Sequence, residues 1–353
     1  MRSLFCSFLL ILCFACDKPE PFDPADYQLN QLELAISFPA VEDGEQRELS
    51  REKLDKLNVK KIRFAEEWRF REPVAGLFNW GPIEARLNWA NENGYEVLLT
   101  VQSNGPDWAC SDRKNERSCV YNGNQAFNTY IDSLLIRFPN QIAKIQYGNE
   151  WQSDFWYIGS AAEFVAANNI VYQAVQEHSP TTQVVLGGFT TISLRLMAGC
   201  AGKLDKFEDD EGNLYDQAFL EANCNGQELT AGLARIDSIL SLAQYDELDL
   251  HLYDDPENWD EILDHFRTLS SSPLIVSEFG GPNLNLESRS ESYQAERLEY
   301  YIRKLDSLQI PEAYFFRLVE GSNNPAHENS GLLTRITKRE KEAFEIFRRF
   351  SNP

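Results

Sequence analysis

The chain has 353 residues, of which 43% are hydrophobic, and carries a formal net charge of −22 at pH 7. This length is compatible with one large α/β domain or with two ordinary domains. A nucleic-acid-binding protein needs a basic surface, so the acidic balance argues against nucleic acid as a partner. The charge is better explained as a solubility feature of an exported protein. Beyond the N-terminal segment, no stretch is apolar enough to predict a membrane span.

The N-terminal residues are typical of a targeting segment. Arg2 supplies a positive charge, a short apolar run follows, and Ala15 is the small residue before a cleavage point, which predicts a signal peptide over residues 1–15. The ending LCFAC resembles a bacterial lipobox with Cys16 as the lipidated residue, and an ordinary secretory signal cut nearby is the alternative. Residues 16–30 are polar and Pro-rich, which predicts a tether. We therefore expect a periplasmic or cell-surface lipoprotein that touches the membrane only through its lipid anchor.

Four cysteines remain beyond the predicted signal and lipid site, namely Cys110, Cys119, Cys200 and Cys224. An even number in an exported chain predicts disulfides, and four cysteines allow three connectivities. We expect Cys110 to pair with Cys119 and Cys200 with Cys224, because each pair brackets one polar segment. A zinc site is the alternative, but the chain has no Cys-x-x-Cys and no His near either pair. We predict no metal and no other cofactor.

Short β-rich runs alternate with amphipathic helical segments along the rest of the chain. Strands are expected over residues 32–38, 59–67, 95–103, 142–150, 183–190, 247–255, 273–281 and 313–321. Helices are expected over 81–94, 124–138, 160–178 and 337–350. This alternation indicates βαβ units and a parallel sheet. Eight such units favour a (β/α)₈ TIM barrel over an open doubly wound sheet, and no nucleotide-binding GxGxxG or GxxxxGK[ST] follows a strand.

The largest departure from the alternation lies at residues 191–235, which contain Cys200, Cys224 and the acidic run KFEDDEGNLYD. The segment follows the fifth predicted strand. We therefore expect a long disulfide-stapled loop there rather than a second domain, and one (β/α)₈ catalytic domain over residues 31–353.

Polar and aromatic side chains gather at the predicted carboxyl ends of the strands, where a barrel of this kind forms its active site. They include two carboxylates: Glu150, in QYGNEW at the end of the fourth strand, and Glu278, in IVSEFGG at the end of the seventh. The others are Arg63, Trp68, Gln102, Trp108, Asn149, Trp151, His251, Tyr253 and Arg317. Amides and carboxylates bond hydroxyl groups, and indoles cover the apolar faces of pyranose rings. This inventory predicts a carbohydrate substrate.

These motifs resemble those of the retaining (β/α)₈ glycoside hydrolases of clan A, the superfamily of cellulases, β-mannanases and β-xylosidases. YGNEW is similar to the Asn-Glu pair that ends strand four in those enzymes, and IVSEFGG to the nucleophile segment of strand seven. RFAEEWRFREPVAGLFNW, which begins at Arg63, is similar to the strand-two Arg of the clan and the segment after it. The resemblance spans roughly residues 32–350 and implies a retaining β-glycoside hydrolase of a poly- or oligosaccharide.

The resemblance implies roles residue by residue. Glu150 would be the acid/base and Glu278 the nucleophile of a double displacement. Asn149 would hold the sugar 2-hydroxyl. Arg63 and Tyr253 would keep Glu278 ionised and oriented, because a cation and a hydroxyl donor both favour the charged carboxylate.

The aromatic surroundings of Glu150 lead to a further expectation. Set against Trp151 and facing another anion, Glu150 is expected to have a raised pKa, as a general acid requires. If the enzyme retains configuration, the carboxyl groups of Glu150 and Glu278 should lie about 5–5.5 Å apart.

Several residues have a second interpretation. His251 is either a substrate contact or a hydrogen-bonded structural imidazole. Arg317 lies in FFRLVEG, where many clan members have a Trp, and either faces an acidic or sulfated sugar or makes a structural salt bridge. The indoles are candidate sugar platforms or loop-packing residues: Trp68, Trp108, Trp151 and Trp156. For the whole protein, which we expect to be a monomer, the alternatives are a glycan-binding lipoprotein without turnover and a transglycosylase.

Overall fold

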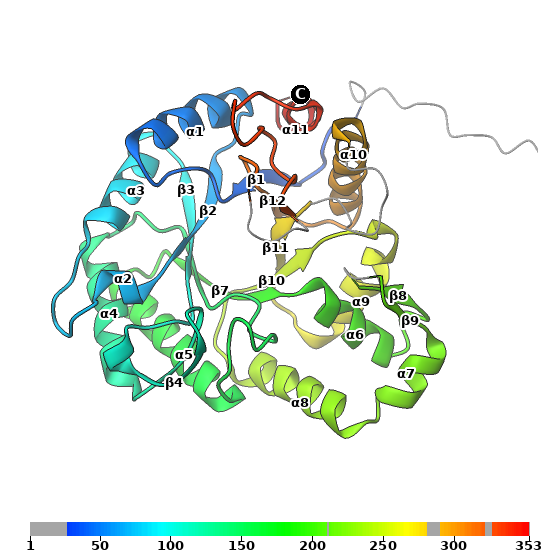
Figure 1. The fold of residues 1–353 in the computed structure, drawn as a ribbon, viewed down its shortest axis with the longest axis horizontal. Helices are drawn as coiled ribbons and strands as arrows, with labels where there is room; N and C mark the ends of the chain where they lie inside the picture. Colours follow the sequence, from blue (N-terminus) through cyan, green and yellow to red (C-terminus); the bar gives the residue numbers. More distant parts are fainter. Residues whose placement is uncertain (1–26, 210–211, 281–289, 322–326, 353) are drawn as a thin grey trace, which may run out of the picture.

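The computed structural model describes residues 27–209, 212–280, 290–321 and 327–352. Eight parallel strands form a closed barrel in the order β1-β12-β11-β10-β7-β6-β3-β2. Figure 1 shows the helices arranged around these strands. The predicted (β/α)₈ TIM barrel is therefore confirmed. The predicted signal peptide, the lipidation site Cys16 and most of the predicted tether lie outside the described residues.

The barrel strands are β1 (Glu33–Ser37), β2 (Lys61–Glu66), β3 (Glu96–Val101), β6 (Lys144–Tyr147), β7 (Gln183–Phe189), β10 (Glu247–Leu252), β11 (Leu274–Phe279) and β12 (Glu312–Phe316). The helices between and after them include α1 (Gly44–Lys56), α2 (Trp68–Arg71), α3 (Gly81–Glu92), α4 (Asn124–Arg137), α5 (Ala161–His178), α8 (Gln227–Leu242), α9 (Trp259–Leu269), α10 (Glu291–Ser307) and α11 (Glu342–Ser351). A hairpin of β4 (Cys110–Asn115) and β5 (Ser118–Tyr121) follows β3. Each strand lies where the sequence predicted it, and all of them end before the predicted boundary, because the polar residues beyond them belong to the loops at the carboxyl ends of the strands.

Helix α5 shows how local sequence sets these elements. Ser160 caps its N-terminus: the backbone N–H of Glu163 donates to the Ser160 hydroxyl, and the Glu163 carboxylate accepts from the Ser160 backbone at 2.8 Å. This capping box satisfies N–H groups that have no partner inside the helix. The buried face repeats every three or four residues, as an amphipathic helix requires, through Phe164, Ala167, Asn168, Val171, Ala174 and Val175.

The barrel interior is filled in layers by alternate strands, as in other barrels of this type. One layer is apolar and includes Ala35, Leu98, Val185 and Ile275, from β1, β3, β7 and β11. The other four strands each begin with a charged residue, Lys61, Lys144, Glu247 or Glu312. Glu312 accepts from Lys61 and, at 3.0 Å, from Lys144, while Lys144 pairs with Glu247 at 2.6 Å. We call these four residues the basal ion ring.

The connection after the fifth barrel strand, β7, was predicted as a long disulfide-stapled loop. It contains α6 (Thr191–Cys200), the short hairpin of β8 (Phe207–Glu208) and β9 (Leu214–Tyr215), and α7 (Gln217–Asn223). A Cys200–Cys224 disulfide joins the end of α6 to the end of α7, as predicted. Phe207 and Leu220 belong to the main hydrophobic core, so the segment packs onto the barrel and forms no second domain.

The last residues of the predicted tether are attached to the barrel. The Tyr27 hydroxyl donates to Asp306 of α10 at 2.8 Å, and the backbone N–H of Asn30 donates to the same carboxylate at 3.0 Å. The Tyr27 ring lies 5.9 Å from that of Phe350 of α11. The ordered body therefore includes residues 27–30, which the sequence had assigned to the tether.

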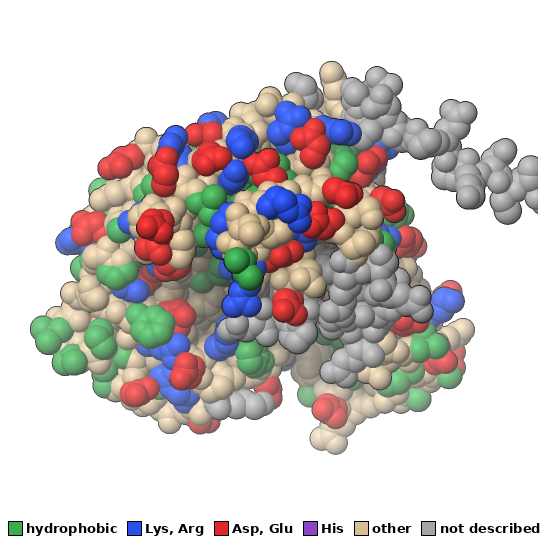
Figure 2. Space-filling model, turned by 45° about the horizontal axis from the view of Figure 1, so that its top comes forward, with side chains coloured by type: hydrophobic (Ala, Val, Ile, Leu, Met, Phe, Trp, Pro, Cys, Tyr) green, Lys and Arg blue, Asp and Glu red, His purple; other side chains and the backbone are tan. Residues whose placement is uncertain are grey.

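The surface carries charges of both signs. Figure 2 shows acidic side chains spread over one face of the molecule and interspersed with Lys and Arg. A long polyanion approaching this face would therefore meet carboxylates as well as cations. Among the helices of the described ranges, none is long and apolar enough to cross a bilayer.

Candidate active site

Glu150 stands three residues beyond β6, the fourth barrel strand, in a sharp turn. Gly148 and Glu150 both adopt positive φ angles, of 72° and 45°. On the neighbouring strand β7, Gly188 has a φ of +75°, and a Cβ atom there would lie 2.4 Å from the backbone nitrogen of Glu150. Only glycine allows this close approach. The height and direction of Glu150 therefore depend on a glycine of the next strand.

Glu278 lies near the end of β11, the seventh barrel strand, and is buried. One carboxylate oxygen accepts from Arg63 at 2.5 Å, and the other accepts from the Tyr253 hydroxyl at 2.5 Å. Burial by itself raises the pKa of Glu278, but the charges of His251 and Arg63 and the two hydrogen bonds outweigh it and lower the pKa to about 2. Glu278 is therefore a fixed, ionised carboxylate at neutral pH.

Arg63 is fully buried beneath the site and uses each guanidinium nitrogen. It donates to Thr100 at 2.9 Å, to Ser37 at 3.1 Å, to Asn149 at 2.8 Å and to Glu278. Its predicted role beside Glu278 agrees with this geometry. The sequence also grouped Arg63 with the substrate contacts, which its full burial contradicts: it positions Asn149 and Glu278 from below.

His251 connects the two carboxylates. Its Nδ1 lies 2.8 Å from Glu150 and 3.8 Å from Glu278, while Nε2 lies 3.4 Å from Asp249 and 3.2 Å from the Ser277 hydroxyl. Burial alone lowers the pKa of His251, but the charge of Glu278 and the hydrogen bonds with Asp249 and Glu150 raise it to about 10. His251 is fully buried, which agrees with the interpretation as a hydrogen-bonded structural imidazole.

The indole that contacts Glu150 is that of Trp156, which donates to the second carboxylate oxygen at 2.7 Å. The sequence had placed Trp151 against Glu150 and among the substrate contacts. Trp151 is instead fully buried and packs against Phe164 and Phe189, with ring centroids 5.1 Å away in each case. Glu150 retains a side-chain exposure of 20%, so its carboxylate can reach a ligand while both oxygens are held.

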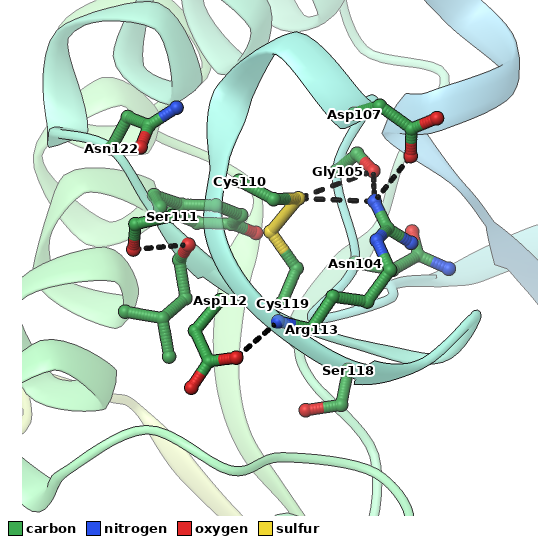
Figure 3. Close-up of a disulfide and its surroundings, with 12 residues drawn as sticks. Asn104, Gly105, Asp107, Cys110, Ser111, Asp112, Arg113, Ser118, Cys119 and Asn122 are labelled. Atoms are coloured by element: carbon green, nitrogen blue, oxygen red, sulfur yellow. Dashed lines mark hydrogen bonds and ion pairs between the residues drawn. A yellow bond between two sulfur atoms is a disulfide. The ribbon is translucent and has the colours of Figure 1, made fainter.

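The β4–β5 hairpin carries the first disulfide, between Cys110 and Cys119, as predicted. Figure 3 shows the Arg113 side chain beside this bond. The Arg113 guanidinium donates to the carbonyl oxygen of Gly105 at 2.5 Å and lies 3.3 Å from the Asp107 carboxylate. These contacts attach the hairpin to the loop that leaves β3. We call β4 and β5, with the turn between them and the Cys110–Cys119 bond, the disulfide hairpin.

The disulfide hairpin supports the loop that contains Trp156. The Arg117 guanidinium lies 4.8 Å from the centroid of the Trp156 ring, a cation–π contact. The Ser118 hydroxyl accepts from the backbone N–H of Ile158 at 2.9 Å. The hairpin therefore holds Trp156, and Trp156 in turn holds Glu150.

Two other predicted platforms pack away from the carboxylates. Trp68 is fully buried and stacks on Tyr130, with ring centroids 5.6 Å apart. Trp108 packs edge-on against Trp68 at 5.6 Å, and its indole N–H donates to the Glu72 carbonyl at 3.0 Å. Full burial of Trp68 contradicts the prediction that it binds substrate, whereas Trp108 is only partly buried and its role as a sugar platform stays a prediction. A large apolar ring stabilises the fold more by burial than it could at the surface.

The remaining two predicted contacts stand at the strand ends. Gln102 follows β3 and is almost buried, and its Oε1 has no hydrogen-bond partner among the described residues. Arg317 follows β12 and is half-buried, and its Nε also lacks a partner within the described chain. The structural salt bridge considered for Arg317 is not present between described residues.

The ligand atoms of Glu150, His251 and Glu278 lie within 4.8 Å of one another. A trio of this kind could hold a metal ion, but both oxygens of Glu278 already accept from Arg63 and Tyr253, and the guanidinium would repel a cation. The donor set therefore fits a metal poorly. One carboxylate oxygen of Glu150 lies within 4.8 Å of one of Glu278. Of the two carboxylates, that of Glu150 is the more exposed to solvent.

The structure is thus a closed (β/α)₈ barrel with one carboxylate just beyond the fourth strand, at Glu150, and the other near the end of the seventh strand, at Glu278. No family model matches the sequence, and no curated protein matches it by sequence. Solved structures share the fold. An exo-β-1,4-mannosidase from Opitutaceae bacterium strain TAV5 aligns over 92% of this chain and 59% of its own, with 16% identity and a TM-score of 0.59.

Two family 39 glycoside hydrolases are also similar. One, from the gut symbiont Bacteroides cellulosilyticus WH2, aligns over 94% of this chain and 65% of its own, with 13% identity and a TM-score of 0.61. The other, a β-xylosidase from Caulobacter crescentus, aligns over 92% of this chain and 71% of its own, with 12% identity and a TM-score of 0.59. The chain spans about six tenths of the mannosidase chain. At these identities, the similarity is one of fold.

Proposed function

We propose that this protein is an exported retaining β-glycoside hydrolase that cleaves a poly- or oligosaccharide. The observation that carries the proposal is the pair of Glu150 and Glu278, whose nearest carboxylate oxygens are within 4.8 Å. Retaining glycosidases have carboxyl groups about 5–5.5 Å apart, whereas inverting enzymes separate them by about 6.5–9.5 Å to admit a water. The short separation supports double displacement.

In the first step, Glu278 attacks the anomeric carbon while the glycosidic carbon–oxygen bond breaks. The Glu278 pKa of about 2 ensures that the attacking group is ionised. Arg63 and Tyr253 keep both oxygens in place, so little reorganisation is needed when the carboxylate becomes an ester.

Glu150 gives its proton to the departing oxygen in this step and later takes one from the attacking water. After the first transfer, its carboxylate accepts from the Trp156 indole and from His251, which lie 2.7 and 2.8 Å away. Asn149 uses Oδ1 to accept from Arg63, so its amide NH₂ is the group that can donate to a sugar hydroxyl. These contacts would orient the acid/base and the sugar.

The test uses a panel of polysaccharides and aryl β-glycosides with the wild type and two variants. Glu278→Ala should abolish turnover of every substrate. Glu150→Ala should still react with an aryl glycoside that has an acidic phenol, stall as the glycosyl-enzyme, and resume with azide to give a β-glycosyl azide. Natural glycosides should slow by about 10²–10⁴-fold in Glu150→Ala, because their leaving alcohols need the proton. Glu84→Ala, on the outer helix α3, is the control.

The outcomes separate the alternatives. Binding of glycans without release of reducing ends would indicate a glycan-binding protein, and lengthened products would indicate a transglycosylase. Equal losses in both variants on activated and natural substrates, with no azide rescue, would contradict the role of Glu150.

Export and lipid attachment are part of the proposal. Two disulfides support an oxidising compartment, since they are rare in cytosolic proteins. The lipobox-like LCFAC supports attachment at Cys16. In a bacterial host, Cys16→Ala should prevent incorporation of labelled fatty acid and release the protein from the membrane fraction. Equal labelling of both forms would contradict the anchor.

A further inference from the structure

Arg317 stands at the mouth of the barrel, directly after β12. The ring of the preceding residue, Phe316, lies 6.3 Å from that of Tyr253, whose hydroxyl donates to Glu278. The Arg317 guanidinium carbon lies 5.8 Å from the centroid of the Phe316 ring. The backbone carbonyl of Arg317 accepts from the backbone N–H of Leu332 at 3.1 Å. Arg317 is therefore fixed by its backbone beside the residues that hold the nucleophile.

The N–H groups of the Arg317 guanidinium make no hydrogen bond to any described residue. In the part of the chain that the structure describes, the guanidinium also makes no ion pair, although its Nε is buried. The other arginines with a buried, unpartnered Nε each donate through another guanidinium nitrogen: Arg86, Arg195, Arg235, Arg297 and Arg303. Partial burial of a cation without a hydrogen-bonded partner costs free energy.

Glu278 does not supply the missing partner. Both of its oxygens already accept from Arg63 and Tyr253, so its charge acts on Arg317 without a direct bond. Burial lowers the pKa of Arg317 from its ordinary value, and the charge of Glu278 opposes this. An arginine remains protonated in proteins. Among the described residues, Arg317 is therefore a cation without a hydrogen-bonded or ion-paired partner that still feels the charge of the nucleophile.

We propose that Arg317 binds an anionic substituent, a carboxylate or a sulfate, on the sugar that occupies the active site. This inference rests on the proposed glycosidase function and specifies its substrate class. A guanidinium offers two parallel N–H groups that match two oxygens of an oxyanion. A neutral hydroxymethyl group has one oxygen and cannot accept both hydrogen bonds in this way. The cation also offsets the repulsion between a charged sugar and the ionised Glu278.

The inference concerns one charged sugar unit, not a polyanionic chain. The net charge of −22 and the carboxylates spread over the face in Figure 2 oppose the approach of a long polyanion. A single carboxylate or sulfate bound at Arg317 is largely shielded from the distant surface carboxylates, because charges beyond about 8 Å are screened at physiological salt.

The test compares matched substrates. For the neutral sugar that the aryl β-glycoside panel identifies as best, kcat/KM is measured for that glycoside, for its uronide and for its 6-sulfate. The enzymes are the wild type, Arg317→Gln, Arg317→Lys and the control Arg137→Gln, which removes one exposed positive charge from the outer helix α4. Thermal melting confirms that each variant is folded.

We expect the wild type to prefer an anionic glycoside over its neutral counterpart. Arg317→Gln should lower the anionic-to-neutral ratio of kcat/KM by about 10–100-fold, the loss typical of a hydrogen bond to a charged group. Arg317→Lys should keep part of the preference, and Arg137→Gln should keep all of it. Preference for the uronide identifies a carboxylate ligand, and preference for the 6-sulfate identifies a sulfate.

Two negative results are distinguishable. If neutral glycosides are hydrolysed without an anionic preference, or the ratio is the same in the wild type and Arg317→Gln, the inference is wrong and the glycosidase function stands. If no glycoside is hydrolysed, the proposed function itself fails. Isothermal titration of the free uronic acid and sugar 6-sulfate into the wild type and Arg317→Gln provides a readout independent of turnover.

Discussion

Replacing Gly188 by alanine should displace Glu150, the proposed acid/base, without removing any of the proposed reacting groups. The added Cβ would lie 2.4 Å from the backbone nitrogen of Glu150, whereas ordinary van der Waals contact begins at 3.4 Å. The backbones of β7 and of the turn after β6 must therefore separate by roughly 1 Å. A misplacement of about 1 Å in a catalytic group can cost about 10²-fold in rate.

The variant also carries a strain that is independent of catalysis. Gly188 has a φ of +75°, and alanine in this region costs on the order of 1–3 kcal/mol. Gly94 provides a matched control, because its φ is +70° and nothing lies within 4 Å of a Cβ there. Gly94→Ala should therefore lose similar stability while its kcat/KM stays at the wild-type value.

The assay measures melting temperature and kcat/KM for both variants on a natural and an activated glycoside. Gly188→Ala should lose about 10²-fold on the natural substrate, and less on an aryl glycoside whose leaving group needs no proton. A folded Gly188→Ala with wild-type turnover would refute the argument that this glycine sets the position of Glu150. Equal activity losses in both variants would attribute the effect to general destabilisation.

Three further predictions follow from the contacts described above. The folded pKa of Glu278, about 2 against 4.5, should contribute stability that is present above pH 4.5 and lost as pH falls toward 2; urea unfolding should show this slope in the wild type and not in Glu278→Gln. Trp156→Phe should reduce kcat/KM about tenfold or more on natural glycosides and less on activated ones, because the contact with Glu150 is lost; an equal effect on both would assign Trp156 to sugar binding. Replacing Cys200 and Cys224 by serine should lower the free energy of unfolding by about 2–4 kcal/mol and leave kcat unchanged; a changed kcat would place the helical connection after β7 in the reaction.

Strand placement could be predicted because the relevant pattern is local. Alternating apolar runs and helical segments gave the eight strands, and the barrel topology then brings the ends of distant strands together. This brought Glu150, Glu278, Arg63 and Tyr253 into one site from sequence positions up to 215 residues apart. Their contacts are those expected of residues at the same end of a parallel barrel.

Side-chain directions beyond the strand ends could not be predicted in the same way. Trp151 follows Glu150, whose positive φ turns the chain, so the adjacent indole enters the core while Trp156 returns to the carboxylate. A periodic pattern carries no information about such a turn. Trp68 gave a local clue, since its indole donates to Glu72 four residues later, at helical spacing.

The polar network that holds His251 could have been predicted from the sequence. In ELDLHL, Asp249 and His251 alternate with leucines, so the two polar side chains share one face of the strand. In a parallel barrel strand that is buried on both faces, such a polar alternation is unusual. It indicates a polar network inside the barrel, and Ser277 completes that network from β11.

The basal ion ring has a consequence at the opposite end of the barrel. Lys61 precedes Arg63 by two residues on β2, and Glu247 precedes Asp249 and His251 by two and four residues on β10. Side chains two residues apart lie on the same side of a strand, so Lys61 and Glu247 each share a row with groups of the site.

A slip of one residue in either strand would turn the ionic residue away from its partners in the ring. The penalty would be several kcal/mol, since a buried charge that loses its partner is strongly destabilising. The ion pairs of the ring therefore fix the register of the strands that carry them. Pairing of lysines and glutamates at the base of the barrel fixes the register, and with it the height, of the site groups on β2 and β10.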